Sequence, residues 1–331
     1  MATQTLDVVG IGNAIVDVLV PSDDAFLSKH DLHKGTMALI DEARADALYR
    51  AIGSGVEASG GSCGNTMAGI ASLGGKGAYI GKVRNDELGG VFAHDLRAIG
   101  VRFDTAPLSQ GPATARCLIL VTPDAQRTMN TYLGACVELG PEDIDPDLVA
   151  SAQVTYLEGY LFDPPRAKEA FRKAAKIAHD AGRKVSLSLS DPFCVDRYRD
   201  EFRELVANHV DILFANESEI CSLYQVNDFE DAMNRVRGQT EIAALTRSEQ
   251  GSVIVTRDRE HRVAAHKPAR VLDSTGAGDL YAAGFLYGLT NGKDLATSGK
   301  LGSLAAAEAI SHYGARPETP LKDLAKKAGL I

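Results

Sequence analysis

The hydrophobic and polar positions of the chain repeat with two periods, one typical of strands and one typical of amphipathic helices. From about residue 141 onward the two patterns alternate. The strand-like runs are 154–161, 185–189 and 210–215, the helical runs are 166–181 and 196–208, and the alternation continues to Val255. Alternation of this kind favours one doubly wound, mostly parallel sheet flanked by helices. We therefore predict an α/β fold whose ligands bind at the carboxyl ends of the strands.

The N-terminal part of the chain carries further strand-like runs that are short and rich in β-branched residues. They lie at 6–9, 15–20, 36–40, 114–122 and 128–133, and residues 123–126 are typical of a hairpin turn. The runs after the first predict a small separate sheet, inserted from about 15–40 and 101–135. Because no internal repeat or low-complexity linker interrupts the sequence, residues 1–331 are expected to form one domain.

The stretch 271–289 carries the strongest candidate chemistry. Val271 and Leu272 read as the end of a strand, residues 273–279 spell DSTGAGD, and an apolar-periodic helix follows. Two glycines at the start of a helix leave backbone N–H groups free to bind an anion. Beside a phosphate, Asp279 is best explained as a base that takes a proton from a hydroxyl. On these residues alone, an ordinary glycine turn with Asp279 as a first-turn helix acid explains the pattern equally well.

Composition narrows the class of protein. The 331 residues are 45% hydrophobic and 24% charged, which is ordinary for a globular chain with a sizeable core. A net charge of −9 argues against nucleic acid or an anionic membrane as the main partner. The five cysteines show no C-x-x-C spacing, and the first 20 residues have no basic segment before an apolar core. We therefore expect a reduced, cytoplasmic protein without a membrane span.

The heptapeptide DSTGAGD resembles the C-terminal signature, D-T-x-G-A-G-D, of the ribokinase (PfkB) family of sugar and nucleoside kinases. Ser274, where the family often has Thr, is a mild departure. Residues 60–89 also resemble the N-terminal signature of the family. The resemblance implies a ribokinase-like fold in which the small sheet is a lid over the sugar site. It further implies that Asp279 is the catalytic base and that Gly276, Ala277 and Gly278 form the anion hole.

Other segments resemble the adenosine kinase branch of this family. The run from Gly10 looks like a dinucleotide fingerprint, but Ile15 stands at the third glycine position and β-branched residues follow. It is more similar to the adenosine kinase segment G-x-G-N-x-x-x-D. The resemblance implies that the ribose and base are bound by Asn13, Asp17, Gly61, Asn65 and Tyr160, and that Arg127 approaches the transferring phosphate. From the residues alone, purely structural roles remain open: Asn13 as a turn residue, Asp17 at a strand edge, Tyr160 in the core and Arg127 as a solvated side chain.

The nucleotide site is implied by two further motifs. Asn216-x-x-Glu219 resembles the family motif tied to Mg²⁺ and phosphate, with oxygen ligands that act partly through water. Simple helix N-capping is the alternative. Thr246 to Gly251 resembles the loop that contacts ATP, and Gly278 would contact the same nucleotide.

The combined resemblance implies ATP-dependent phosphorylation of the 5′-hydroxyl of adenosine, giving AMP and ADP. The alternatives are a sugar kinase of the same family, acting on ribose, fructose or a keto-deoxy sugar acid, and a nucleoside-binding module without turnover. Asp279 argues against the binding module, because pure binding has no need of a base. ATP and Mg²⁺ are the expected co-substrate and cofactor. A need for a monovalent cation such as K⁺, and the choice between monomer and homodimer, stay open.

Overall fold

The computed structural model describes residues 6–124 and 126–331, and two sheets organise this part of the chain. The large sheet runs in the order β14 (Glu260–Val263), β13 (Ser252–Val255), β12 (Ile242–Thr246), β11 (Ile212–Asn216), β10 (Lys184–Ser188), β9 (Ala152–Glu158), β1 (Leu6–Ile11), β5 (Gly77–Ile80) and β6 (Arg102–Phe103). Pairs from β6 to β12 are parallel, and β13 and β14 add an antiparallel edge. The mostly parallel α/β fold is thus confirmed.

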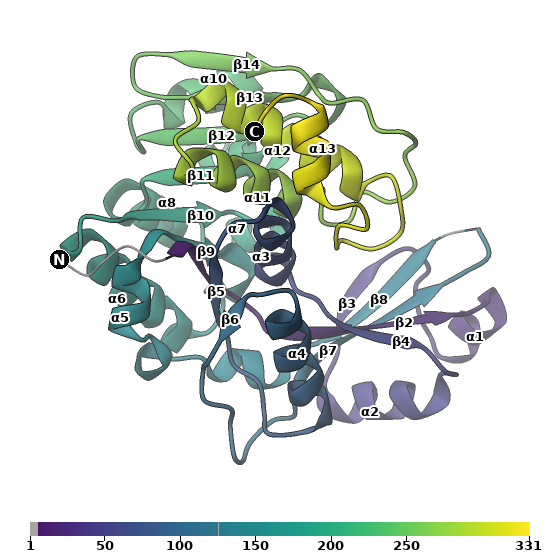
Figure 1. Ribbon diagram of the computed structural model, residues 1–331. Helices are drawn as coiled ribbons and strands as arrows, with labels where there is room; N and C mark the ends of the chain where they lie inside the picture. The colour runs from purple at the N-terminus through teal and green to yellow at the C-terminus, as the bar shows by residue number, and fades with distance from the viewer. Residues whose placement is uncertain (1–5, 125) are drawn as a thin grey trace.

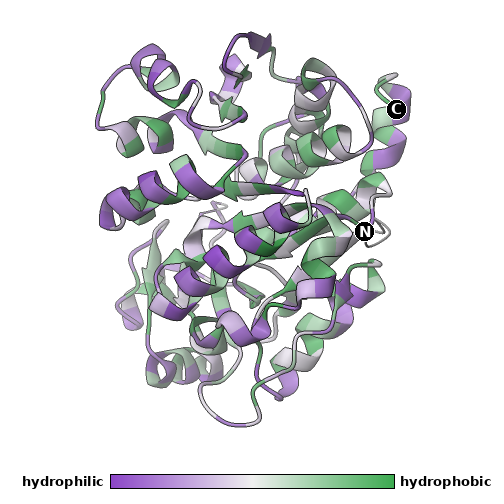
Figure 2. Ribbon diagram, turned by 90° about the vertical axis from the view of Figure 1, so that its left-hand side faces the viewer, coloured by the Kyte–Doolittle hydropathy of each residue, from purple (hydrophilic) through white to green (hydrophobic). Residues whose placement is uncertain are grey.

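Helices cover both faces of the large sheet, because successive strand residues point to opposite sides. Val9 and Ile11 belong to one core layer, whereas Val8 belongs to the other. The first layer is built with α5 (Pro146–Ser151), α6 (Pro165–Asp180), α7 (Pro192–Arg197), α8 (Arg199–His209), α9 (Glu217–Tyr224) and α10 (Phe229–Val236). The second contains α3 (Ser62–Leu73), α4 (Glu87–Ala98) and α11 (Ala277–Thr290), with α12 (Leu295–Ala309) and α13 (Leu321–Lys327) packed outside. Figure 2 shows that helices on the α5–α6 side carry hydrophilic as well as hydrophobic stretches.

The small sheet has the order β3 (Met37–Leu39), β8 (Arg127–Tyr132), β7 (Ala115–Val121), β2 (Ile15–Pro21) and β4 (Val56–Ser59). Figure 1 shows it projecting from the large sheet beside α1 (Asp24–Lys29) and α2 (Glu42–Ala51). Two details differ from the predicted insertion. β4 lies outside both predicted ranges, and β6 pairs with β5 in the large sheet, where Phe103 packs edge-on against Tyr79.

The chain crosses between the two sheets at glycine-containing segments. Gly12, Asn13 and Ala14 connect β1 of the large sheet to β2 of the small sheet. Gly60 and Gly61 connect β4 of the small sheet to α3, which packs on the large sheet. Residues predicted to bind the sugar therefore lie where the two sheets meet.

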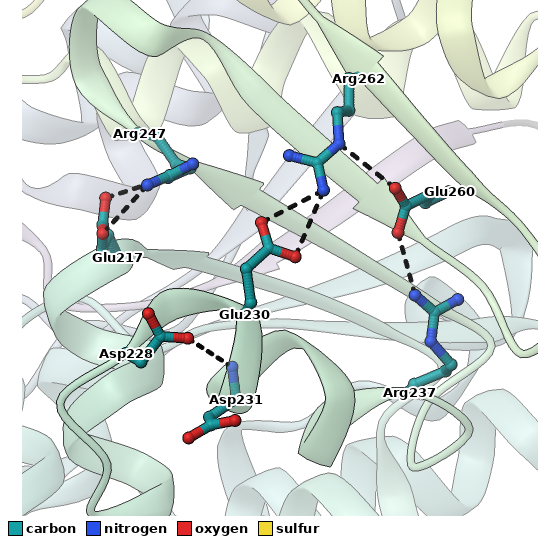
Figure 3. Close-up of polar contacts among 8 residues, drawn as sticks. All are labelled: Glu217, Asp228, Glu230, Asp231, Arg237, Arg247, Glu260 and Arg262. Atoms are coloured by element: carbon teal, nitrogen blue, oxygen red, sulfur yellow. Dashed lines mark hydrogen bonds and ion pairs between the residues drawn. The ribbon is translucent and has the colours of Figure 1, made fainter.

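The edge formed by β12, β13 and β14 carries a group of ion pairs (Figure 3). Arg247 pairs with Glu217, while Arg262 of the edge strand pairs with both Glu230 and Glu260. Surface pairs of this kind contribute little stability each. Charged side chains along an edge strand do discourage another strand from adding to the sheet.

Three local predictions need correction. Val271 and Leu272 are not the end of a strand; they lie in a loop with 68% and 36% of their surfaces exposed. The predicted helix 196–208 is two helices, α7 and α8, separated at Tyr198. The predicted strand 154–161 ends at Glu158 and continues as a short 3-10 helix, η3 (Gly159–Phe162); the other 3-10 helices are η1 (Gly134–Glu138), η2 (Pro141–Asp143) and η4 (Ser248–Gln250). Among residues 6–124 and 126–331, no helix is long and apolar enough to cross a membrane.

Candidate active site

Asp279 lies in the first turn of α11 and is held by two side chains of α3. The Ser62 hydroxyl donates to Asp279 Oδ1 at 2.6 Å, and Asn65 Nδ2 donates to Oδ2 at 2.9 Å. Thr66 Oγ1 also donates to the backbone carbonyl of Asp279 at 3.2 Å. The two helices are thus joined at their starts, and the carboxylate has a fixed orientation.

The start of α11 is open toward this carboxylate. Its N-cap, Gly276, adopts a left-handed conformation with φ of 78°, and no side chain of the described residues caps the helix. A Cβ at Gly276 would lie 2.4 Å from Ala315 Cβ, which explains the glycine there. A Cβ at Gly278 would meet no described atom within 4 Å, so protein packing gives no reason for that glycine. The open N–H groups and the free space suit an anion.

The electrostatic surroundings of Asp279 suit a base. Burial raises its pKa above the ordinary value of 3.8, while the hydrogen bonds from Ser62 and Asn65 and the charge of Arg316 lower it. A raised carboxyl pKa brings proton affinity closer to the operating pH, which favours general base catalysis.

Asp17 lies on β2 close to the same carboxylate. A Cβ at Gly60 would come within 2.3 Å of the Asp17 carboxyl carbon, so the turn before α3 packs directly on this side chain. Burial raises the pKa of Asp17 to about 6; the charges of Arg316 and Arg127 oppose this shift, and that of Asp279 adds to it. The predicted sugar-binding Asp17 and the predicted base therefore influence each other.

Asn13 and Gly61 meet at the crossing between the sheets, over the buried Glu158. Asn13 Nδ2 donates to Glu158 Oε1 at 2.7 Å, and Cys63 N donates to Oε2 at 2.8 Å. Gly61 has φ of 81°, and a Cβ there would lie 2.5 Å from the Asn13 carbonyl oxygen. Burial raises the pKa of Glu158 to about 7 despite these hydrogen bonds. An acceptor carboxylate thus fixes the orientation of the Asn13 amide.

Arg127, at the start of β8, reaches the loop before α11. Its Nη1 donates to Asp273 Oδ2 at 2.8 Å, and both side chains are only 9% exposed. Asp273 also accepts from Gly314 N at 3.0 Å and from the Thr275 hydroxyl at 2.7 Å. Arg127 Nε and Nη2 are buried and have no partner among the described residues. The small sheet therefore brings two unused donors to the anion loop.

The predicted nucleotide residues lie at neighbouring strand ends. Asn216 ends β11 and is the register partner of Thr246, which ends β12. Asn216 and Glu219 form a capping box: Asn216 N donates to Glu219 Oε2 at 2.9 Å, and Glu219 N donates to Asn216 Oδ1 at 2.9 Å. Gly251 has φ of 86°, and a Cβ there would lie 2.0 Å from Val263 O. The strand turn thus accounts for this glycine without a ligand.

Tyr160 follows the end of β9, and a separate cavity, which none of the predicted site residues lines, lies beside the small sheet. Tyr160 lies in η3, is 38% exposed, and has a pKa raised by burial and then by Asp191 and Asp279. A cavity of about 400 Å³ lies beside β3, β8 and η1, and its lining includes Leu39, Ile40, Leu133 and Val137. Cys136 of η1 donates its thiol to Ala14 O at 3.3 Å, so η1 adjoins the crossing segment.

A family model matches most of the chain. The model for the pfkB family of carbohydrate kinases matches residues 37–322. The chain belongs to this family. The resemblance seen in the sequence is therefore confirmed.

Several relatives match almost the whole kinase chain. The structure of adenosine kinase from Sinorhizobium meliloti is 54% identical, with a TM-score of 0.90 over 98% of this chain and 99% of that chain. A structure described as a probable sugar kinase protein from Rhizobium etli CFN 42 is 55% identical, with a TM-score of 0.92 over 99% and 100%. Adenosine kinase from Saccharomyces cerevisiae is 26% identical over 94% of this chain and 96% of its own. The protein is an ATP-dependent kinase for a sugar or a nucleoside.

The kinase site suits a Mg²⁺ ion that binds together with the phosphates of the substrate. No three acidic, His or Cys side chains of residues 6–124 and 126–331 cluster as a metal site. Both oxygens of Glu219 already accept hydrogen bonds from Asn216. Burial raises the pKa of Glu219 to about 7, so a cation nearby would stabilise its charged form. Mg²⁺ commonly keeps several waters and binds one or two carboxylates together with substrate phosphates.

Sequence reasoning missed four side chains that organise the kinase site. Ser62 and Asp273 belong to the two signatures but had no assigned catalytic or binding role, whereas Glu158 and Arg316 belong to no motif that was singled out. An available signal was a polar or charged residue next to a glycine or in an apolar strand: Ser62 follows Gly61, Glu158 ends an apolar run before Gly159, and Arg316 follows Gly314-Ala315.

Proposed function

We propose that this kinase transfers the γ-phosphoryl group of ATP to the 5′-hydroxyl of adenosine, giving AMP and ADP, with Asp279 as the general base. The orientation of the Asp279 carboxylate, held by Ser62 and Asn65 beside the open start of α11, carries the proposal. A base must lie next to both the hydroxyl and the group that receives it.

The reaction uses the groups around Asp279 in sequence. Asp279 takes the proton as the 5′-oxygen bonds to the γ-phosphorus, and the bond from that phosphorus to the leaving ADP oxygen breaks. N–H groups at the start of α11 and the unused Nε and Nη2 of Arg127 stabilise the charge of the phosphoryl group. Mg²⁺ bound to the ATP phosphates, near Glu219, would neutralise part of their charge.

Two features of the described chain support adenosine as the substrate, and the second, an aromatic side chain, is the one that a free sugar would not need. Asp17, Asn13 and Asn65 supply polar groups for ribose hydroxyls, with Gly61 allowing close approach. A partly exposed Tyr160 offers an aromatic face to a base. The S. meliloti relative, described as an adenosine kinase, supports the same substrate.

Turnover of the purified protein tests the proposal. ADP release should be measured with adenosine, other nucleosides, ribose, fructose and a keto-deoxy sugar acid, and AMP should be identified as the product. Parallel reactions without Mg²⁺, and with Na⁺ in place of K⁺, measure the cation requirements. Adenosine should give the highest kcat/KM. Efficient phosphorylation of a sugar with none of adenosine would overturn the substrate.

Asp279→Asn tests the base separately. The Asn amide can donate to Ser62 Oγ while its oxygen accepts from Asn65 Nδ2, so the fold should remain intact. Because the folded state raises the pKa of Asp279, removing the charge should leave Tm at pH 8 equal or higher. We expect kcat to fall by about 10²–10⁴ with KM flat or lower. A stable variant that keeps more than about a tenth of wild-type kcat would refute Asp279 as the base.

A further inference from the structure

Three consecutive residues between α12 and α13 fasten the active-site loop to the turn before α3. Gly314 N donates to Asp273 Oδ2 at 3.0 Å. Ala315 is the residue against which Gly276 packs, since a Cβ at Gly276 would lie 2.4 Å from Ala315 Cβ. Arg316 Nη2 then donates to the carbonyl oxygen of Ser59 at 2.7 Å and to its hydroxyl at 3.1 Å. This segment thus connects the anion loop with the end of β4.

Arg316 is placed between the two carboxylates of the site. Ser59 precedes Gly60, which packs on the Asp17 carboxylate. On the other side, the Arg316 Nη2 atom lies 3.2 Å from the position of a Cβ at Gly64, next to the Asn65 that holds Asp279. Arg316 Nε is buried without a partner among the described residues. The guanidinium therefore contacts Ser59, before the turn that leads into α3, and lies against Gly64 of that helix; this segment packs on Asp17 at one end and leads into Asn65 at the other.

Arg316 offsets part of the negative charge in this region. The titratable groups that interact with Asp279 come from several elements: Asp17 of β2, Cys63 of α3, Tyr156 and Glu158 of β9, Tyr160 of η3, Glu219 of α9 and Arg316. Four of these side chains, counting Asp279 itself, are carboxyl groups. Arg316 lowers the pKa of both Asp17 and Asp279, and Arg127 lowers that of Asp17. Like charges close together in a buried site disfavour ionisation.

We propose that Arg316 is a positioning residue that fixes the turn before α3 and keeps Asp17 and Asp279 ionised together. Ribose binding by Asp17 and proton removal by Asp279 can then take place at the same pH. The inference rests on the proposed function, because it assigns Arg316 a role for the base Asp279. Arg316 does not itself contact the reacting atoms. Its charge lowers the pH above which both carboxyl groups are ionised, against the opposing effect of burial.

The test is the pH profile of kcat/KM for adenosine in four proteins. Arg316→Gln removes the charge and keeps a side-chain donor for Ser59, whereas Arg316→Lys keeps the charge. Arg97→Gln is the matched control, since Arg97 also donates to a backbone carbonyl, that of Phe103. We expect the acidic limb of Arg316→Gln to move upward by about one pH unit, a loss of about tenfold on that limb. The acidic limb of Arg97→Gln should lie at the same pH as that of the wild type, and the acidic limb of Arg316→Lys should lie close to that pH.

A double variant keeps the test decisive. Arg316→Gln combined with Asp17→Asn restores the charge balance, so the acidic limb should return toward the wild-type pH although KM for adenosine rises. If Arg316→Gln alone does not fold, the double variant should fold; failure of both to fold would assign Arg316 a packing role and overturn the proposal. An unmoved limb in a folded Arg316→Gln protein would overturn it too. Asp279→Asn separates the two hypotheses: a fully active Asp279→Asn protein refutes the proposed base, whereas an inactive one with an unmoved Arg316→Gln limb refutes only this inference.

Discussion

Gly60→Ala should weaken substrate binding by displacing the Asp17 carboxylate, although no polar side chain is replaced. Gly60 is buried between β4 and α3, and a Cβ there would lie 2.3 Å from Asp17 Cγ, 2.3 Å from Oδ2 and 2.6 Å from Oδ1. Its φ is outside the left-handed region, so alanine strains no backbone dihedral. Ordinary contacts begin at about 3.4 Å, and the added methyl group must therefore push the carboxylate away by about 1 Å.

The size of the effect follows from that displacement. A misplacement of about 1 Å in a positioning group can cost about 10²-fold in rate. Losing hydrogen bonds to a charged group costs about 1.5–3 kcal/mol, which is about 10- to 150-fold in affinity. If Asp17 binds the ribose hydroxyls, kcat/KM for adenosine should fall by about 10- to 100-fold, mostly through KM.

Steady-state kinetics and thermal unfolding of the same preparations decide the matter. Gly90→Ala is the matched control: Gly90 lies exposed in α4, a Cβ there meets no described atom within 4 Å, and alanine should stabilise the helix by about 0.5–1 kcal/mol. Gly60→Ala added to Asp17→Ala should cause no further loss, because both act through one carboxylate. A folded Gly60→Ala protein with wild-type KM for adenosine would refute the role of Asp17 in binding the ribose hydroxyls.

Two other predictions concern the crossing segment and the small sheet. Glu158→Gln should raise KM for adenosine. When the NH2 group of the Gln side chain faces Asn13, it meets the Asn13 Nδ2 donor, and the Asn13 amide must flip before a hydrogen bond can form. The pKa of Glu158 rises from 4.5 to about 7 on folding, so ionisation of this carboxyl group lowers the free energy of unfolding as pH rises through this interval. The loss is at most roughly 3 kcal/mol. Urea unfolding at pH 5 and 8 should show this loss in the wild type and not in Glu158→Gln. If the small sheet is a lid, hydrogen exchange in residues 114–133 should slow when adenosine binds, and protection confined to other segments would contradict that assignment.

The parts of the site that the sequence predicted are those encoded in consecutive residues. Gly276 to Asp279 lie within one turn of chain, and the open helix start follows from the glycines themselves. The βαβ alternation likewise predicted the parallel strands, because each strand packs beside its sequence neighbour through a helix. Val271 and Leu272 were assigned to a strand from their apolar character, although in the structure they are exposed in the loop before α11.

The parts that the sequence did not predict depend on contacts between distant residues. Ser62 meets Asp279 across 217 positions, Asn13 meets Glu158 across 145, and Arg316 meets Ser59 across 257. None of these pairs has a local spacing rule, because each joins elements that are brought together only by the tertiary fold. The sequence also did not predict that β4 belongs to the small sheet, because this depends on its pairing with β2 rather than on its own residue pattern.

The same long-range contacts explain how the two sheets form one site. Asp17 and Arg127 belong to the small sheet, whereas Asp279 and Asp273 belong to the segment that packs on the large sheet. Bringing Asp17 toward Asp279 alone would place like charges together at a cost. The Arg127–Asp273 pair joins the same two parts with opposite charges, and Arg316 adds a cation from a third segment. The cation of the small sheet, Arg127, and the cation of the C-terminal segment, Arg316, thus offset part of the repulsion between Asp17 and Asp279, and a change at either arginine should alter the pKa of Asp17.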